Sequence, residues 1–143
     1  MRNRYGYLSA TDTFRLLEAG LTVYIVSAPP ATRALPLDGA WVDGEGNLHT
    51  DCSAVVLNPN TAREIGRAYR QQCFLRLTPC ADGEFELYLL RDTELNRQVA
   101  LKYGGGYTAD GEHLFVAVNA KKSVFLKDYV DWLTCDVEFV PVK

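Results

Sequence analysis

The chain has 143 residues, of which 48% are hydrophobic, and a formal net charge of −3 at pH 7. This length and composition predict one compact domain over residues 1–143 with a substantial core. The slight negative charge argues against a general electrostatic attraction to nucleic acid or to an anionic membrane. No apolar run approaches the roughly 20 residues of a membrane span. The first residues, MRNRYGYLSATDTF, lack the apolar stretch of a signal peptide. We therefore expect a cytoplasmic protein without a membrane partner.

The four cysteines of the chain do not form a recognisable metal or redox motif. They are Cys52, Cys73, Cys80 and Cys135. No C-x-x-C pair is present, the spacings match no zinc template, and only His49 and His113 could complete a ligand set. In a reducing compartment such cysteines are free thiols, several of them buried. The sequence predicts neither a metal site nor a cofactor.

The N-terminal region predicts a short helix. Ser9 together with Asp12, or Thr11 alone, can cap a helix that continues through Glu18. Gly20 is a typical residue just past a helix end.

Two β elements are expected next along the chain. Leu21 to Ser27 reads LTVYIVS and is rich in β-branched and aromatic residues, which favours a strand. Trp41 to His49 contains a glycine-bearing turn between two short apolar runs and indicates a hairpin.

The clearest unit of the sequence begins with the apolar run from Ser53 to Leu57, which predicts a buried strand. A helix follows, extending to about Gln72. Either Asn58 is its N-cap, with a proline in the first turn, or Thr61 opens a capping box; the sequence leaves both registers open.

Two further runs, Cys73 to Leu77 and Phe85 to Leu90, predict strands. The link between them, residues 78–83, carries proline and Asp-Gly, which form turns. An antiparallel hairpin is the simplest interpretation.

The C-terminal third predicts two more strands, a helix and a last strand. Gln98 to Tyr103 and His113 to Val118 are interpreted as paired strands, Ala120 to Thr134 as the third helix, and Asp136 to Val142 as the final strand. The predicted fold class is therefore α+β: a mostly antiparallel sheet of six to eight strands with about three helices packed on it.

Arg63, Arg67 and Arg70 are one candidate binding site. They recur at helical spacing on a face different from the apolar stripe, and three guanidinium groups in line could bind phosphates or an acidic protein surface. A solvated helix face with carboxylate neighbours is the commoner explanation of such a pattern.

A second candidate is the loop formed by Tyr103, Gly104, Gly105, Gly106 and Tyr107. Consecutive glycines allow close approach of a ligand to the backbone, and flanking tyrosines could stack on a base or a sugar. The segment is neither a P-loop nor a Rossmann fingerprint. A long hairpin connection explains the same residues without a ligand.

A catalytic cysteine is a weaker hypothesis. Cys52 lies close to His49 in sequence, but alternation along a strand would direct the two side chains to opposite faces. His113 could supply a base only if the fold brought it near. No catalytic residue is therefore assigned.

The segment from Ser53 to Leu77 loosely resembles the strand–helix–strand core of a family of bacterial domains of unknown function, with Ala62 and Gly66 among the fitting positions. This resemblance implies no activity.

Three functions follow from these features. The first is a protein-interaction or accessory module, with a partner protein or self-association; the size and composition would suit a bacterial accessory or mobile-element protein. The second is a nucleic-acid binder that uses the arginine face, which the net charge disfavours. The third is a small enzyme using Cys52 or a histidine, so that enzymatic activity is undecided but not favoured.

Overall fold

The fold is taken from a computed structural model, which describes residues 7–28, 39–42, 45, 47–103, 106–109, 111–117 and 129–143. This part of the chain contains three helices: α1 (Ala10–Glu18), α2 (Pro59–Ala68) and α3 (Glu94–Tyr103). It also contains nine strands: β1 (Val23–Ser27), β2 (Gly39–Val42), β3 (Leu48–Asp51), β4 (Ser53–Val56), β5 (Cys73–Pro79), β6 (Phe85–Arg91), β7 (Gly106–Ala109), β8 (Glu112–Ala117) and β9 (Tyr129–Pro141). None of these three helices is long and apolar enough to span a lipid bilayer.

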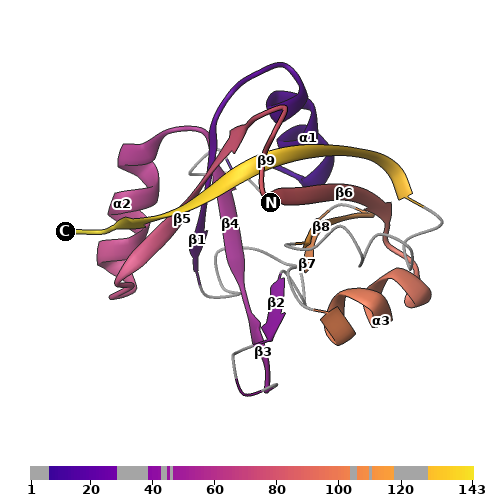
Figure 1. Cartoon of the computed structure of the whole chain (residues 1–143). Helices are drawn as coiled ribbons and strands as arrows, with labels where there is room; N and C mark the ends of the chain where they lie inside the picture. Colours follow the sequence, from indigo (N-terminus) through magenta and orange to yellow (C-terminus); the bar gives the residue numbers. More distant parts are fainter. Residues whose placement is uncertain are drawn as a thin grey trace.

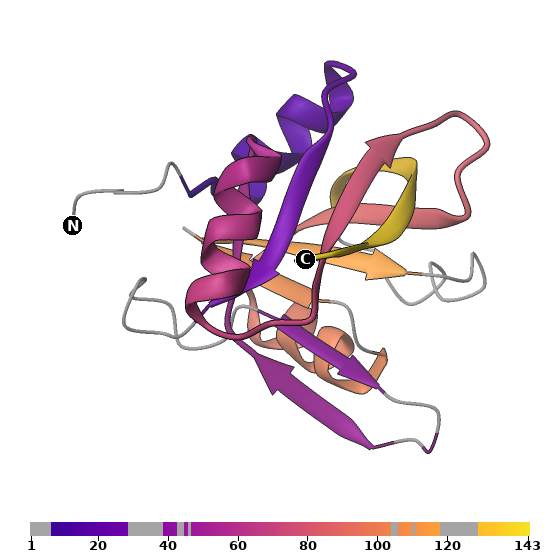
Figure 2. The same ribbon diagram turned by 90° about the vertical axis from the view of Figure 1, so that its left-hand side faces the viewer.

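The nine strands form one sheet in the order β3-β2-β7-β8-β6-β9-β5-β1-β4, and all the described pairings are antiparallel. The first and last strands of this order, β3 and β4, are separated in sequence only by Cys52, so the sheet must curl back on itself (Figures 1 and 2). The α+β class with a mostly antiparallel sheet and three helices is confirmed. The described strands exceed the expected six to eight.

Helix α1 adopts the first of the two possible caps: the Ser9 hydroxyl accepts a hydrogen bond from the Asp12 N–H at 3.1 Å. Gly20 follows the helix with φ +92°, a conformation that glycine adopts without strain. The buried side of α1 carries Phe14 and Leu17. Both belong to the larger of the two core clusters, with side chains from β1, β4, β5, β6, β8 and β9.

Helix α2 is capped by Asn58, whose side-chain oxygen accepts from the Asn60 N–H at 2.8 Å, so the first of the two open registers is the one adopted. The helix ends at Ala68, earlier than the expected Gln72. Its buried residues pack with β1, β4 and β5 on the opposite face of the sheet from α1, in the second core cluster: Val26, Ala28, Ala54, Val56, Ala62, Ile65, Phe74 and Val142.

The expected strand at Gln98 to Tyr103 is wrong, because these residues lie in α3. The hydroxyl of Thr93 accepts from the Asn96 N–H at 3.2 Å, and the Asp92 carboxylate accepts from the Arg97 guanidinium at 2.8 Å. These contacts stabilise a first helical turn that the short apolar pattern did not reveal.

The expected third helix, Ala120 to Thr134, is wrong over its described part, since Tyr129–Pro141 is a single long strand. Leu133 and Val137 pack on the α1 core, whereas Val140 packs on the α2 core. Within the residues expected to be helical, Trp132 is exposed whereas the adjacent Leu133 packs on the α1 core, which is the period of two of a strand. Residues 118–128 lie outside the described part.

The expected hairpin of residues 73–90 is also wrong, because β9 lies between β5 and β6. β5 pairs with Cys135–Pro141, and β6 pairs with the other half of β9, up to Cys135. The link from β5 to β6 therefore crosses β9 at Cys135. There the Thr134 hydroxyl donates to the Cys80 carbonyl at 2.6 Å, and the Glu84 N–H donates to Asp136 Oδ1 at 3.2 Å.

Gly83 lies directly on the backbone of β9 at this crossing. A Cβ atom at position 83 would come within 2.4 Å of the Cys135 carbonyl oxygen, where no flexible atom can move aside. By contrast, a Cβ at Gly66 in α2 would meet the end of the Val142 side chain at 2.6 Å, which can rotate.

We predict that Gly83→Ala lowers the free energy of unfolding by about 2–4 kcal/mol, as expected for a forced backbone shift. The matched variant Gly66→Ala should stay within about 1 kcal/mol of the original chain, because helix propensity offsets the adjustment of Val142. Urea unfolding of both variants measures the difference. Equal effects would show that Gly83 does not need its close approach to β9.

Candidate interaction surface

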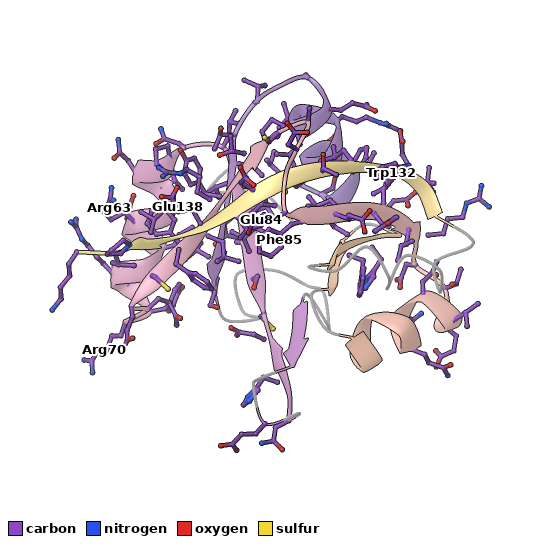
Figure 3. All side chains as sticks on the ribbon, viewed as in Figure 1. Arg63, Arg70, Glu84, Phe85, Trp132 and Glu138 are labelled. Atoms are coloured by element: carbon purple, nitrogen blue, oxygen red, sulfur yellow. The ribbon has the colours of Figure 1, made fainter. Side chains whose placement is uncertain are left out.

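The three arginines of the predicted helix face do not act as one free stripe. Arg63 donates through Nε to the Val142 carbonyl at 3.1 Å, and its guanidinium lies 5.5 Å from the ring centre of Phe74. Arg67 is exposed in the last turn, and Arg70 is exposed beyond the helix with φ +56°. Figure 3 shows the Arg70 side chain well below that of Arg63 in this view, and not beside it. Arg63 thus connects α2 to Val142 near the C-terminus.

The second predicted site is split between two elements. Tyr103 is the last residue of α3, whereas Gly106 and Tyr107 begin β7, with Gly106 opposite both Ala40 and Phe115. Gly104 and Gly105 lie outside the described residues. Tyr103 therefore belongs to a helix and Tyr107 to a strand, whereas the sequence predicts a loop between two paired strands.

The residues considered for catalysis lie in different surroundings. Cys52 occupies the bend between β3 and β4, and its carbonyl accepts from the Ala28 N–H at 2.8 Å. Cys135 is fully buried, and burial raises the pKa of its thiol to about 12. A thiol with such a pKa is not a nucleophile near neutral pH. All four cysteines are free.

His113 is buried in β8, with 1% of its surface exposed. Desolvation lowers its pKa to about 4, with the negative charge of Asp92 opposing the shift and the positive charge of Arg97 adding to it. The imidazole is therefore neutral at pH 7 and packs as part of the sheet. Among the described residues, no group of three or more histidine, cysteine or carboxylate side chains could hold a metal ion.

The C-terminal half of β9 has an open backbone edge. The Val142 N–H donates to the Gln72 carbonyl at 3.0 Å, and the Thr134 carbonyl accepts from the Cys80 N–H at 3.2 Å, so even-numbered residues direct their backbone groups toward β5. Alternate residues of an antiparallel strand point to opposite sides. Val137 and Phe139 therefore point away from β5. Beyond Cys135, no described strand pairs with β9 on that side.

Several side chains of β9 are apolar although they are exposed to solvent. Phe139 is 73% exposed, the highest value among the exposed large apolar residues described. Val130 and Trp132, in the other half of β9, are each 46% exposed, and Trp132 stacks on Tyr88 at 6.2 Å. A single strand thus carries three of the large apolar side chains that the described fold leaves exposed.

The opposite face of the same edge is acidic. Glu138 is exposed and forms an ion pair with Arg76 on β5, and Asp136 is exposed beside the β5–β6 link. Glu84 is exposed in that link, and a carboxylate oxygen of Glu86 on β6 is buried with no hydrogen-bond partner in the described part of the chain. Figure 3 shows Glu84 and Glu138 along β9. We call Val137–Pro141, with its apolar and acidic faces, the β9 edge.

The sequence predicts Asp136 to Val142 as a strand, but it does not show that, among the described residues, no strand pairs with the outer side of Val137–Pro141. The signal was nevertheless present: LTCDVEFVPV alternates between apolar and acidic residues, which is typical of a half-exposed strand. Which strand pairs with which is not readable from such a pattern.

The chain matches no family model, and it shows no significant similarity to a curated protein or to a solved structure. The loose resemblance of residues 53–77 to a bacterial family thus has no support from these comparisons.

The buried His113 predicts loss of stability in acid. The pKa of His113 in the folded chain, about 4, lies below the ordinary histidine value of 6.5, so the unfolded chain binds the proton more readily and stability falls as the pH drops from 6.5 toward 4. The loss attributable to His113 is about 3 kcal/mol. Urea unfolding at several pH values should show a flatter profile for His113→Gln, whereas the exposed His49→Gln should retain the original slope. Parallel profiles for all three proteins would contradict this role.

The β9 edge predicts a pattern of amide exchange that requires no mutation. The N–H groups of Val137 and Phe139 should exchange with solvent at least roughly a hundredfold faster than those of Glu138 and Val140, which face β5. Hydrogen–deuterium exchange followed by NMR measures each amide separately. Uniform protection of all four residues would mean that the edge is covered in solution.

Proposed function

We propose that this chain is a protein-interaction or accessory module of the cytoplasm, and that it uses the β9 edge to bind its partner. The observation that carries the proposal is the side of β9 beside Phe139, with which no strand in the described part of the chain pairs. Unpaired edge strands invite pairing with another chain, and proteins normally cover, shorten or charge them. An edge left open beside an exposed aromatic side chain is therefore better explained by a binding role than by packing.

The distribution of exposed apolar residues supports the same proposal. Val130, Trp132 and Phe139 all lie on β9, although the described chain offers many other surface positions. Strand alternation places Trp132 on the face opposite to Phe139, so the two form separate apolar positions on β9. Aromatic residues are the usual anchors of protein interfaces, and Phe139 is the one that lies on the β9 edge.

The alternative functions have less support. A nucleic-acid binder needs clustered cations, but Arg63 is engaged with Val142 and Phe74, and carboxylates accompany β9. An enzyme needs a group poised to react, but His113 and Cys135 are buried with pKa values far from neutrality. Cys52 carries no observation that favours catalysis.

An affinity-capture experiment tests the proposal. The tagged chain is used as bait in lysate from the source cells, with and without nuclease, and each captured protein is identified, purified and titrated against the bait. We expect one protein partner that survives nuclease treatment. Phe139→Glu should weaken its binding at least about tenfold, because a charge replaces a buried aromatic anchor.

Leu95→Glu is the matched control, since Leu95 is 58% exposed on α3, away from β9. It should leave the affinity unchanged. Capture that disappears with nuclease would replace the proposal with nucleic-acid binding. Equal effects of the two variants would place the interface elsewhere.

A further inference from the structure

We infer that the occupant of the β9 edge is an extended segment of a partner protein in which basic and apolar residues alternate, and that it binds by adding a strand to the sheet. This inference rests on the proposed function and specifies the chemistry of the partner.

The backbone of the edge is arranged for strand addition. Val137 and Phe139 each direct one N–H and one C=O away from β5, and Pro141 directs only a carbonyl because it has no N–H. The crossing of the β5–β6 link limits the edge at Asp136, whose carboxylate holds the Glu84 N–H. The available length is therefore that of a short peptide strand, as in other cases of β-augmentation.

The two faces of the edge specify the side chains of the added strand. Residues opposite Val137 and Phe139 would lie on the face of the α1 core, where Val137 packs and the Phe139 ring is exposed. The residue opposite Glu138 would lie on the acidic face. Cross-strand pairs favour apolar against apolar and cation against anion. The complementary segment thus reads apolar, basic, apolar.

A second copy of this chain is a poorer occupant. One register that uses the outward backbone groups of both copies pairs Val137 with Phe139 and places the two Glu138 carboxylates directly opposite each other, whereas the register that pairs Phe139 with itself places each Glu138 opposite Val140, so Glu138 meets no cation in either register. Like charges in that position destabilise a strand pair. Glu138 already has Arg76 as a partner on its own sheet, but it remains 60% exposed and able to meet a cation from the open side.

Synthetic peptides test the inference on the intact chain. The probe is a seven-residue peptide that alternates valine with lysine, blocked at both ends. A matched peptide replaces lysine with glutamate, and a third keeps the lysines but is N-methylated on the backbone amides that would face β9. Binding is followed by NMR shifts up to millimolar peptide, together with exchange protection of the Val137 and Phe139 amides.

We expect the lysine peptide to bind and to protect both amides, and the other two peptides to bind at least about tenfold more weakly. Glu138→Lys should lower the affinity for the lysine peptide about fivefold and raise the affinity for the glutamate peptide, because residue 138 then repels lysine and attracts glutamate across the strand pair. Glu94→Lys on α3, an exposed charge reversal outside β9, should change neither affinity.

Each outcome decides between defined alternatives. Equal binding of the lysine peptide and its N-methylated form would overturn strand addition in favour of charge attraction alone. If none of the peptides binds, the inferred chemistry of the partner is overturned. The proposed function still stands in that case if Phe139→Glu weakens binding of the captured partner. If no captured partner is weakened by Phe139→Glu, the proposed function and the inferred chemistry are both overturned. Sedimentation velocity of the original chain and the two variants tests self-association. A dimer that Glu138→Lys strengthens or Phe139→Glu abolishes would assign the edge to a second copy instead.

Discussion

The crossing of the β5–β6 link over β9 at Cys135 is the constraint on which the rest of the structure depends. β9 is a long strand that pairs with β6 in its first half and with β5 in its second, and Cys135 pairs with both. The link must pass over the backbone at that residue, which requires a glycine at position 83 and hydrogen bonds from the flanking Thr134 and to Asp136. β9 therefore joins the part of the sheet that contains β6 to the part that contains β5. Without β9, these two parts would be connected only at the bend near Cys52.

This arrangement has a direct consequence for surface chemistry. Because β5 and β6 are offset along β9, each pairs with only one half of it, so no strand among the described residues pairs with Val137–Pro141 on the side away from β5. A strand with two faces and one free edge offers hydrogen-bonding groups, an aromatic side chain and carboxylates within a few residues. The same chain trace that closes the core thus creates the β9 edge, and no separate loop or insertion is needed to form a binding surface.

Local chemistry made much of the fold predictable. The caps of α1 and α2 were readable because serine and asparagine side chains satisfy the first free N–H groups of a helix. The strands at residues 23–27, 53–56, 73–79 and 85–91 were readable from β-branched and aromatic runs. Predictions failed where a short pattern fitted two periods: Gln98 to Tyr103 is helical and Tyr129 to Thr134 extended, because tertiary partners rather than propensity select between them.

The sequence by itself determined the α+β class and the antiparallel character of the sheet, and it limited the starts of α1 and α2 to two possible caps each, since these follow from side-chain patterning and capping within a few residues. Only the tertiary structure decided that β9 separates β5 from β6, that Arg63 is tied to the end of the chain, and that Phe139 is exposed beside an unpaired backbone edge. Strand order joins residues more than 50 positions apart, as between Glu84 and Asp136. No local preference encodes such contacts, which depend on how several apolar faces are buried together.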